Sequence, residues 1–191
     1  MSAYVALKEK GLPFEVVPLN LQAGEHRSSA FAELSTTQRV PTISDGGFNL
    51  SESSAICEYL DEAYPGLRLY PTDLKAKAKA REIQAWLRSD LARLREERST
   101  EVVFLKRSPP PLSSGAQAAA DKLFNAVGRL LPPGQQTLFG EWSIADTDLA
   151  LMLNRLVLAG DAVPERLAGY ARHQWQRSSV QSWVQMSRNV P

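Results

Sequence analysis

Short segments with changing hydrophobic spacing make up the first third of the chain. Apolar positions at helical spacing over residues 3–7 predict a helix, and Gly11 is placed to end it. A run rich in apolar and β-branched residues, 14–17, then predicts a strand, and residues 30–34 predict one further turn of helix after a polar loop. This alternation is typical of a small α/β unit.

A pair of glycines marks a tight turn in the segment that follows. Gly46 and Gly47 separate two short apolar runs, 42–43 and 48–50, which is typical of a two-residue β-hairpin. Beyond the hairpin, apolar residues recur every three or four positions over 51–64. A helix there would close the first unit.

After a linker at 65–71 the apolar spacing becomes almost purely helical. Residues 74–98 predict one long amphipathic helix, whereas residues 144–158 are apolar on all sides of a helix and should be buried. The remaining expectations are helices at 116–131, 164–170 and 179–186 and a proline-containing loop at 106–114. An all-helical bundle therefore follows the α/β unit.

Composition narrows the class of protein. The 191 residues suffice for one domain or two small ones. With 22 Lys and Arg against 21 Asp and Glu, the formal net charge is +1, so bulk charge gives no reason to expect nucleic acid as a partner. The charged start of the chain is typical neither of a signal peptide nor of a membrane span, and a single cysteine, Cys57, forms no internal disulfide. We expect a cytoplasmic protein with no membrane partner.

Hydroxyl and carboxylate side chains open the helix expected at 51–64. Ser51, Glu52, Ser53 and Ser54 come before its first apolar turn. The unpaired N–H groups and positive dipole end of a helix start bind carboxylates, and a side-chain carboxylate in the same turn can hold an ammonium group. The segment could therefore bind both charges of an α-amino acid. The same residue types also favour an ordinary helix start, so both interpretations stay open at this point.

A proline stands at the head of the first hairpin strand, ten residues upstream of the helix start. Because Pro41 has no N–H, it suits a strand edge, a bulge or a cis turn. If the bond is cis, the backbone of Val40 would face outward as a free ladder for an extended ligand.

Other candidate centres are weaker. Ser143 and Asp146 have the spacing of a capping box, to which we assign a folding role. Cys57 lies among apolar neighbours, where structural cysteines outnumber reactive ones. His26 and His173 do not have the spacing of metal ligands, so we expect no metal site.

Three stretches carry a resemblance to a known family. Residues 39–41 (Arg-Val-Pro), the run 50–56 (Leu-Ser-Glu-Ser-Ser-Ala-Ile) and residues 143–148, which include both Asp146 and Asp148, resemble the signature stretches of cytosolic glutathione transferases. The runs 83–90 and 139–142 are similar to a bacterial subgroup with conjugation and glutathione-dependent peroxidase activity.

The resemblance implies an α+β protein with two domains. Residues 1–66 would form a thioredoxin-like domain that binds glutathione, and residues 72–191 an all-α helical bundle. Glutathione would be the co-substrate, activated for conjugation to a small electrophile or for reduction of a peroxide. Family members form homodimers, and the helical face of 74–98 would be the contact.

The resemblance also implies a glutathione-binding set. Val40, before a cis Pro41, would pair its backbone with the cysteinyl unit. Glu52 and Ser53 would take the γ-glutamyl end, and Arg39 would suit the glycyl carboxylate.

The front of the chain departs from the family pattern. Family members open with a central strand and a loop carrying the Ser, Tyr or Cys that activates the glutathione sulfur, whereas this sequence begins inside the first helix. We therefore expect a shortened form of a longer protein that lacks the first strand, with the unknown catalytic group lying before Met1. The alternative is a non-catalytic glutathione-binding or assembly protein of the same fold.

Overall fold

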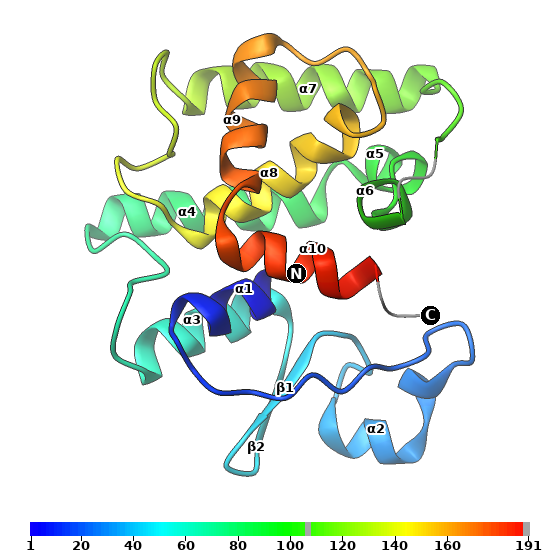
Figure 1. Cartoon of the computed structure of the whole chain (residues 1–191), viewed down its shortest axis with the longest axis vertical. Helices are drawn as coiled ribbons and strands as arrows, with labels where there is room; N and C mark the ends of the chain where they lie inside the picture. Colours follow the sequence, from blue (N-terminus) through cyan, green and yellow to red (C-terminus); the bar gives the residue numbers. More distant parts are fainter. Residues whose placement is uncertain (106–107, 189–191) are drawn as a thin grey trace. The chain divides into compact units, whose positions relative to one another are not determined.

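A computed structural model describes residues 1–105 and 108–188. The chain divides into two compact units, Met1–Leu69 and a second that begins at Tyr70, and Figure 1 draws the first in blue and cyan. The first contains helices and a small sheet, and the elements of the second are helices. The prediction of an α/β unit followed by a helical one is confirmed, and the finer limits 1–66 and 72–191 stay a prediction.

Apart from the strand expected at 14–17, the first unit follows the predicted order of helix, strand, helical turn, hairpin and helix. Its elements are α1 (Ser2–Glu9), the 3₁₀ turn η1 (Glu25–Arg27), α2 (Ser29–Leu34), β1 (Thr42–Asp45), β2 (Phe48–Ser51) and α3 (Ser53–Ala63). Gly11 has a φ of 66° and follows the end of α1, as expected of a residue that ends a helix.

The hairpin of β1 and β2 has the turn that its glycines predict. The strands are antiparallel, with Asp45 opposite Phe48 at the turn and Thr42 opposite Ser51 at the open end. Gly46 and Gly47 have φ angles of 55° and 91°, which a two-residue turn of this kind requires and side chains resist.

The helices α1 and α3 pack against each other and share a buried ion pair. The Lys10 Nζ lies 3.5 Å from Asp61 Oδ1, and both side chains are almost fully buried. The same amine donates to the carbonyl of Tyr64 at 2.7 Å, and Asp61 Oδ1 accepts from the Leu69 N–H at 2.7 Å. These contacts fasten the end of α1 to the end of α3 and to the segment that follows.

Two expectations for the first unit are wrong in detail. The predicted strand at 14–17 is absent, because residues 12–20 have no regular structure and the described sheet contains only β1 and β2. A strand is held by its ladder partner, and Val17 is 75% exposed here. Helix α3 begins at Ser53 and not at Ser51, because Ser51 pairs with Thr42 at the end of the hairpin.

The second unit is an assembly of helices around α8. The elements are α4 (Leu74–Ser89), α5 (Ala92–Glu97), α6 (Thr100–Leu105), α7 (Ser114–Leu130), α8 (Ile144–Val157), α9 (Glu165–Trp175) and α10 (Ser178–Arg188). Helix α8 packs against α4 and α9, and nearly all of its side chains are buried. The prediction of a buried helix there is confirmed.

The single long helix expected at 74–98 is wrong, because the chain breaks between α4 and α5. Leu91 has a φ of 58° and a ψ of 25°, the left-handed conformation that ends a helix, although it is neither glycine nor asparagine. Its side chain is 2% exposed, and Leu94 in the next turn is fully buried. Tertiary burial of the two leucines therefore outweighs local preference.

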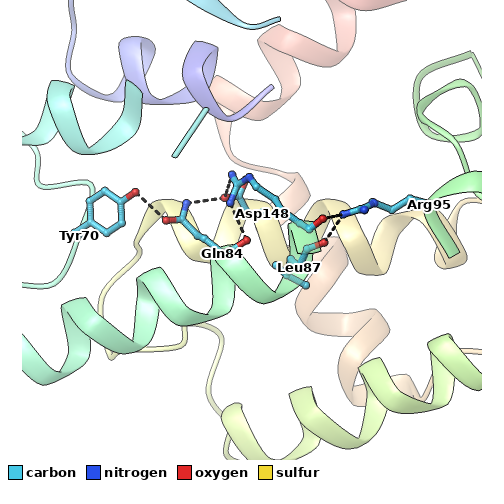
Figure 2. Close-up of polar contacts among 6 residues, drawn as sticks. Tyr70, Gln84, Leu87, Arg95 and Asp148 are labelled. Atoms are coloured by element: carbon cyan, nitrogen blue, oxygen red, sulfur yellow. Dashed lines mark hydrogen bonds and ion pairs between the residues drawn. The ribbon is translucent and has the colours of Figure 1, made fainter. Parts of the chain in front are cut away.

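An arginine satisfies the carbonyl groups that the break exposes. Arg95 donates through Nη1 to the carbonyl oxygens of Leu87 at 2.8 Å and Arg88 at 2.5 Å, as Figure 2 shows. A cation there also complements the negative end of the dipole of α4. The break is thus part of the folded structure and not a frayed end.

Part of the loop expected at 106–114 lies outside the described residues, namely 106 and 107. Residues 108–113 have no regular structure, and Ser114 begins α7. None of the described helices combines the length and the apolar character needed to cross a membrane.

Candidate functional site

The turn that leads into β1 presents an open stretch of backbone. The Val40–Pro41 peptide bond is cis, and Val40 is 44% exposed. Among the described residues, no group bonds to the N–H or C=O of Val40. The side chain of Arg39 is exposed beside it. The turn therefore offers one backbone donor, one backbone acceptor and a cation to an extended ligand.

The start of α3 is also open. Glu52 occupies its N-cap position, is exposed, and makes no side-chain cap. The first hydrogen bond of the helix runs from the Ile56 N–H to the Glu52 carbonyl at 2.9 Å. In the described part of the chain, the N–H groups of Ser54 and Ala55 have no acceptor, so they can bind an anion.

Glu52 has a strained backbone, with a φ of 73° and a ψ of 114°. A residue with a side chain pays about 1–3 kcal/mol for such a conformation, and such residues concentrate at functional sites. The strain at Glu52 thus points independently to the same helix start that sequence reasoning selected.

Hairpin register brings the two openings together. Thr42 directly follows the turn at 39–41, and Ser51 directly precedes Glu52, and these two residues are opposite partners across β1 and β2. The five residues expected to bind glutathione, Arg39, Val40, Pro41, Glu52 and Ser53, are therefore grouped around one end of the hairpin.

Sequence reasoning missed a cluster of hydroxyl groups behind this end of the hairpin. The Ser51 Oγ lies 2.6 Å from the Ser35 Oγ and 2.9 Å from the Thr42 Oγ1. Thr42 Oγ1 in turn donates to the Arg39 carbonyl at 2.9 Å. The hairpin register could have indicated the Thr42–Ser51 contact, but nothing in the sequence indicated Ser35.

Comparison with known proteins identifies the family. A family model described as the glutathione S-transferase N-terminal domain matches residues 1–62, and one described as the C-terminal domain matches residues 73–189. The chain belongs to the glutathione S-transferase family. Its first unit is thus the thioredoxin-like domain and its second the helical domain of that fold, as the resemblance implied.

Individual relatives agree with this assignment. A glutathione transferase homolog from Burkholderia (BGR1), solved with bound glutathione, is 44% identical, has a TM-score of 0.79, and is matched over 100% of this chain and 91% of that chain. Glutathione S-transferase theta-1 of Mus musculus is 38% identical over 61% of this chain and 50% of its own length. The Homo sapiens theta-1 protein is 39% identical over 48% of this chain and 39% of its own length. The chain thus spans half or less of these curated relatives.

The signature residues Ser143 and Asp146 form a hydrogen-bonded cap at the start of α8. The Asp146 carboxylate is fully buried and accepts from the N–H and the hydroxyl of Ser143 at 2.8 and 2.9 Å. It also accepts from the Leu138 N–H and the Tyr170 hydroxyl, both at 2.8 Å. Burial raises the pKa of Asp146, while these four donors act in the opposite direction. Asp146 closes the start of α8, so the predicted folding role is supported.

A second buried network joins α4 to α8. Gln84 accepts from the Tyr70 hydroxyl at 2.8 Å and donates to Asp148 Oδ2 at 2.7 Å, and Arg88 also binds that oxygen at 2.8 Å (Figure 2). The donors Tyr70, Gln84 and Arg88 each have an acceptor in the second unit. Asp148, the second acidic residue of the signature, therefore holds two helices together.

The weaker candidates give no second site. Cys57 is fully buried in α3. His26 lies in η1 and His173 in α9. Over residues 1–105 and 108–188, no three His, Cys, Asp or Glu side chains are grouped so that they could hold a metal ion.

Proposed function

We propose that this protein binds glutathione at the open end of its hairpin and is a glutathione transferase. The activated thiol would be conjugated to a small electrophile or would reduce a peroxide. The observation that carries the proposal is the strained Glu52, whose side chain does not cap α3, at the same hairpin end as Val40, whose backbone no described residue bonds. Membership of the glutathione S-transferase family and the bound glutathione of the Burkholderia relative support it.

Each group at the site suits one part of the tripeptide. The Glu52 carboxylate would bind the γ-glutamyl ammonium, and the Ser53 hydroxyl with the first-turn N–H groups of α3 would bind the α-carboxylate. The N–H and C=O of Val40, which is 44% exposed, would pair with the cysteinyl unit. Arg39 would bind the glycyl carboxylate.

Chemistry at the sulfur requires the thiolate, because a thiol with a pKa of about 8.5 is mostly protonated at neutral pH. Donors aimed at the sulfur would lower that pKa and prepare the nucleophile for attack on carbon or on a peroxide. We assign the sulfur-activating donor to no residue of the described chain. Conjugation and peroxide reduction share this activation step.

Membership of the family also supports a proposal on partners and location. We propose a homodimer in which residues 74–98, now α4 and α5, supply the contact, in a cytoplasmic protein. Sedimentation equilibrium would show a mass twice that of the 21.1 kDa chain, whereas a single-chain mass would contradict the proposal.

Calorimetric titration with glutathione tests the binding site. We expect Glu52→Gln to weaken binding by about 10- to 100-fold, because it removes a charge-assisted hydrogen bond. Glu33→Gln changes another exposed acidic side chain, in α2, and is the matched control that should bind like the wild type. Equal affinity of the two variants would show that Glu52 is not part of the site.

A conjugation assay with an aromatic halide and a peroxide-reduction assay separate catalysis from binding. Turnover in either assay supports the transferase. Binding without turnover supports the non-catalytic alternative, and a wild type that does not bind glutathione would overturn both.

A further inference from the structure

Three hydroxyl groups and one carbonyl form a continuous chain behind the hairpin end. Ser35 reaches Ser51 at 2.6 Å, Ser51 reaches Thr42 at 2.9 Å, and Thr42 reaches the Arg39 carbonyl at 2.9 Å. A longer contact of 3.4 Å also joins the Ser35 hydroxyl to the Arg39 carbonyl. Ser35 is 1% exposed, whereas Ser51 and Thr42 are half-buried. This hydroxyl chain thus leads from the interior of the first unit to the turn that contains Val40.

The direction of these hydrogen bonds follows from counting protons. A carbonyl has no proton, so Thr42 donates to Arg39 and its only hydroxyl proton is used. The contact between Thr42 and Ser51 therefore needs Ser51 as donor, and the contact between Ser51 and Ser35 needs Ser35 as donor. The single Ser35 proton thus goes to Ser51 at 2.6 Å and not to the Arg39 carbonyl, which lies 3.4 Å from the Ser35 Oγ. Ser51 and Thr42 both accept and donate along this path, an arrangement in which hydrogen bonds strengthen one another.

The Arg39 carbonyl belongs to the same peptide group as the Val40 N–H. This peptide bond is trans, and the C=O and N–H of a planar trans peptide point in opposite directions. When the hydroxyl chain holds the carbonyl toward the interior, it turns the Val40 N–H away from it. The Val40 N–H has no partner among the described residues, and Val40 is 44% exposed.

We propose that Ser35, Ser51 and Thr42 are positioning residues that fix the Arg39–Val40 peptide so that the Val40 N–H donates to a backbone carbonyl of bound glutathione. The inference rests on the proposed function and extends it to residues that never touch the ligand. Ser51, a member of the same hydroxyl chain, directly precedes Glu52. The hydroxyl chain therefore fixes the backbone beside both Val40 and Glu52.

Backbone strain lies beside two members of this hydroxyl chain, Arg39 and Ser51. Three non-glycine residues of the described structure have positive φ, and two of them, Gln38 at 51° and Glu52 at 73°, stand next to Arg39 and Ser51. Strained residues persist where the surroundings hold them in place, and the hydroxyl chain is such a support.

Variants at the Thr42 end test the proposal directly. We expect Thr42→Val, which keeps the side-chain volume but loses the donor, to raise the Kd for glutathione about tenfold. Thr42→Ser restores the hydroxyl and should remain within about twofold of the wild type. Thr37→Val makes the same exchange at an exposed residue two positions before Arg39 and is the matched control.

Two more variants separate positioning from simple destabilisation. Ser51→Ala should raise the Kd about threefold and Ser35→Ala less than twofold, because each bond lies one step farther from the Thr42 hydroxyl that holds the Arg39 carbonyl. The direct contact of Ser35 with that carbonyl is 3.4 Å long and therefore weak. Ser35 is the most buried of the three, so Ser35→Ala should lower the unfolding midpoint most. If the role were purely structural, the variant with the lowest unfolding midpoint would also bind most weakly. Ser35→Ala would then lose more affinity than Ser51→Ala, which is the opposite of the order expected here.

The Val40 amide signal in ¹H–¹⁵N spectra gives a readout at the peptide itself. In the wild type it should shift when glutathione is added, and Thr42→Val should change its position before glutathione is present. If Thr42→Val binds glutathione as tightly as the wild type does, this inference is wrong and the proposed function still stands. A wild type without glutathione binding overturns the proposed function and this inference with it.

Discussion

The starts of α3 and α8 resemble each other in sequence and differ in structure. Both have a serine shortly before the helix and an acidic residue close by, Ser51 with Glu52 and Ser143 with Asp146. At α8 the carboxylate is fully buried and accepts four hydrogen bonds. At α3 the carboxylate is exposed, caps nothing, and belongs to a residue with a strained backbone.

The difference teaches how to tell folding residues from binding residues in this chain. A buried polar group must have its hydrogen-bond partners in the folded protein, because an unmet one costs about 1–3 kcal/mol. Groups that remain unpaired are tolerated only where water or a ligand can reach them. Asp146 meets the first condition and Glu52 the second, so substitutions at the two should have opposite profiles in stability and binding.

The largest expected effect is on the closed helix start. Asp146→Ala should lower the free energy of unfolding by about 3 kcal/mol or more, because it leaves buried donors of Ser143 and Leu138 without an acceptor. Urea unfolding followed by circular dichroism would measure it. Asp121→Ala in α7, where the carboxylate is exposed, is the control and should stay within about 0.5 kcal/mol. Similar losses in both variants would contradict the assignment.

A smaller effect of opposite sign is expected at the open helix start. Glu52→Gly should raise the free energy of unfolding by roughly 1 kcal/mol, because glycine adopts a φ of 73° without strain. The same variant should lose glutathione affinity with its carboxylate. Glu52→Ala is the matched control, since it loses the carboxylate but keeps the strain, and it should bind as weakly without gaining stability. Greater stability together with undiminished glutathione binding would mean that the strain serves another purpose.

Sequence reasoning succeeded where a residue type carries its own conformational preference. The paired glycines predicted the hairpin, and the apolar character of 144–158 predicted the buried α8. It failed where tertiary contacts decide: the strand at 14–17 has no ladder partner among the described residues, and burial of Leu91 breaks the long helix.

The candidate site shows the same limit. Val40 and Glu52 could be selected from motif and spacing, and the structure groups them at one hairpin end. The positive φ of Glu52 and the contact of Ser35 with Ser51, sixteen residues apart, have no local signal in the sequence. The assignment of the five residues to glutathione stays a prediction.

Helix α3 is also bonded to the turn end of the hairpin, through Asp45. Asp45 Oδ2 accepts from the Tyr59 hydroxyl at 2.7 Å and from the Tyr64 hydroxyl, and the ring of Phe48 lies 5.2 Å from that of Tyr59. The hydrogen bond from Tyr64, and then that from Tyr59, lowers the pKa of Asp45. The bond to Asp45 raises the pKa of Tyr64 to about 12. The turn of the hairpin is thereby fastened to α3, away from the residues that stay open.

The smallest expected effect is a pH dependence of these bonds to Asp45. The raised pKa of Tyr64 means that its contribution to stability is complete below the unfolded value of about 10 and is lost as the pH rises from there to about 12. The lowered pKa of Asp45 acts at the other end of the scale, where stability is lost as the pH falls below about 4. Tyr64→Phe should therefore flatten the alkaline loss in urea midpoints measured between pH 9 and about 12. Tyr59→Phe, which keeps the Tyr64 bond, should follow the wild type more closely, and parallel curves for wild type and Tyr64→Phe would show that the bond to Asp45 does not support α3.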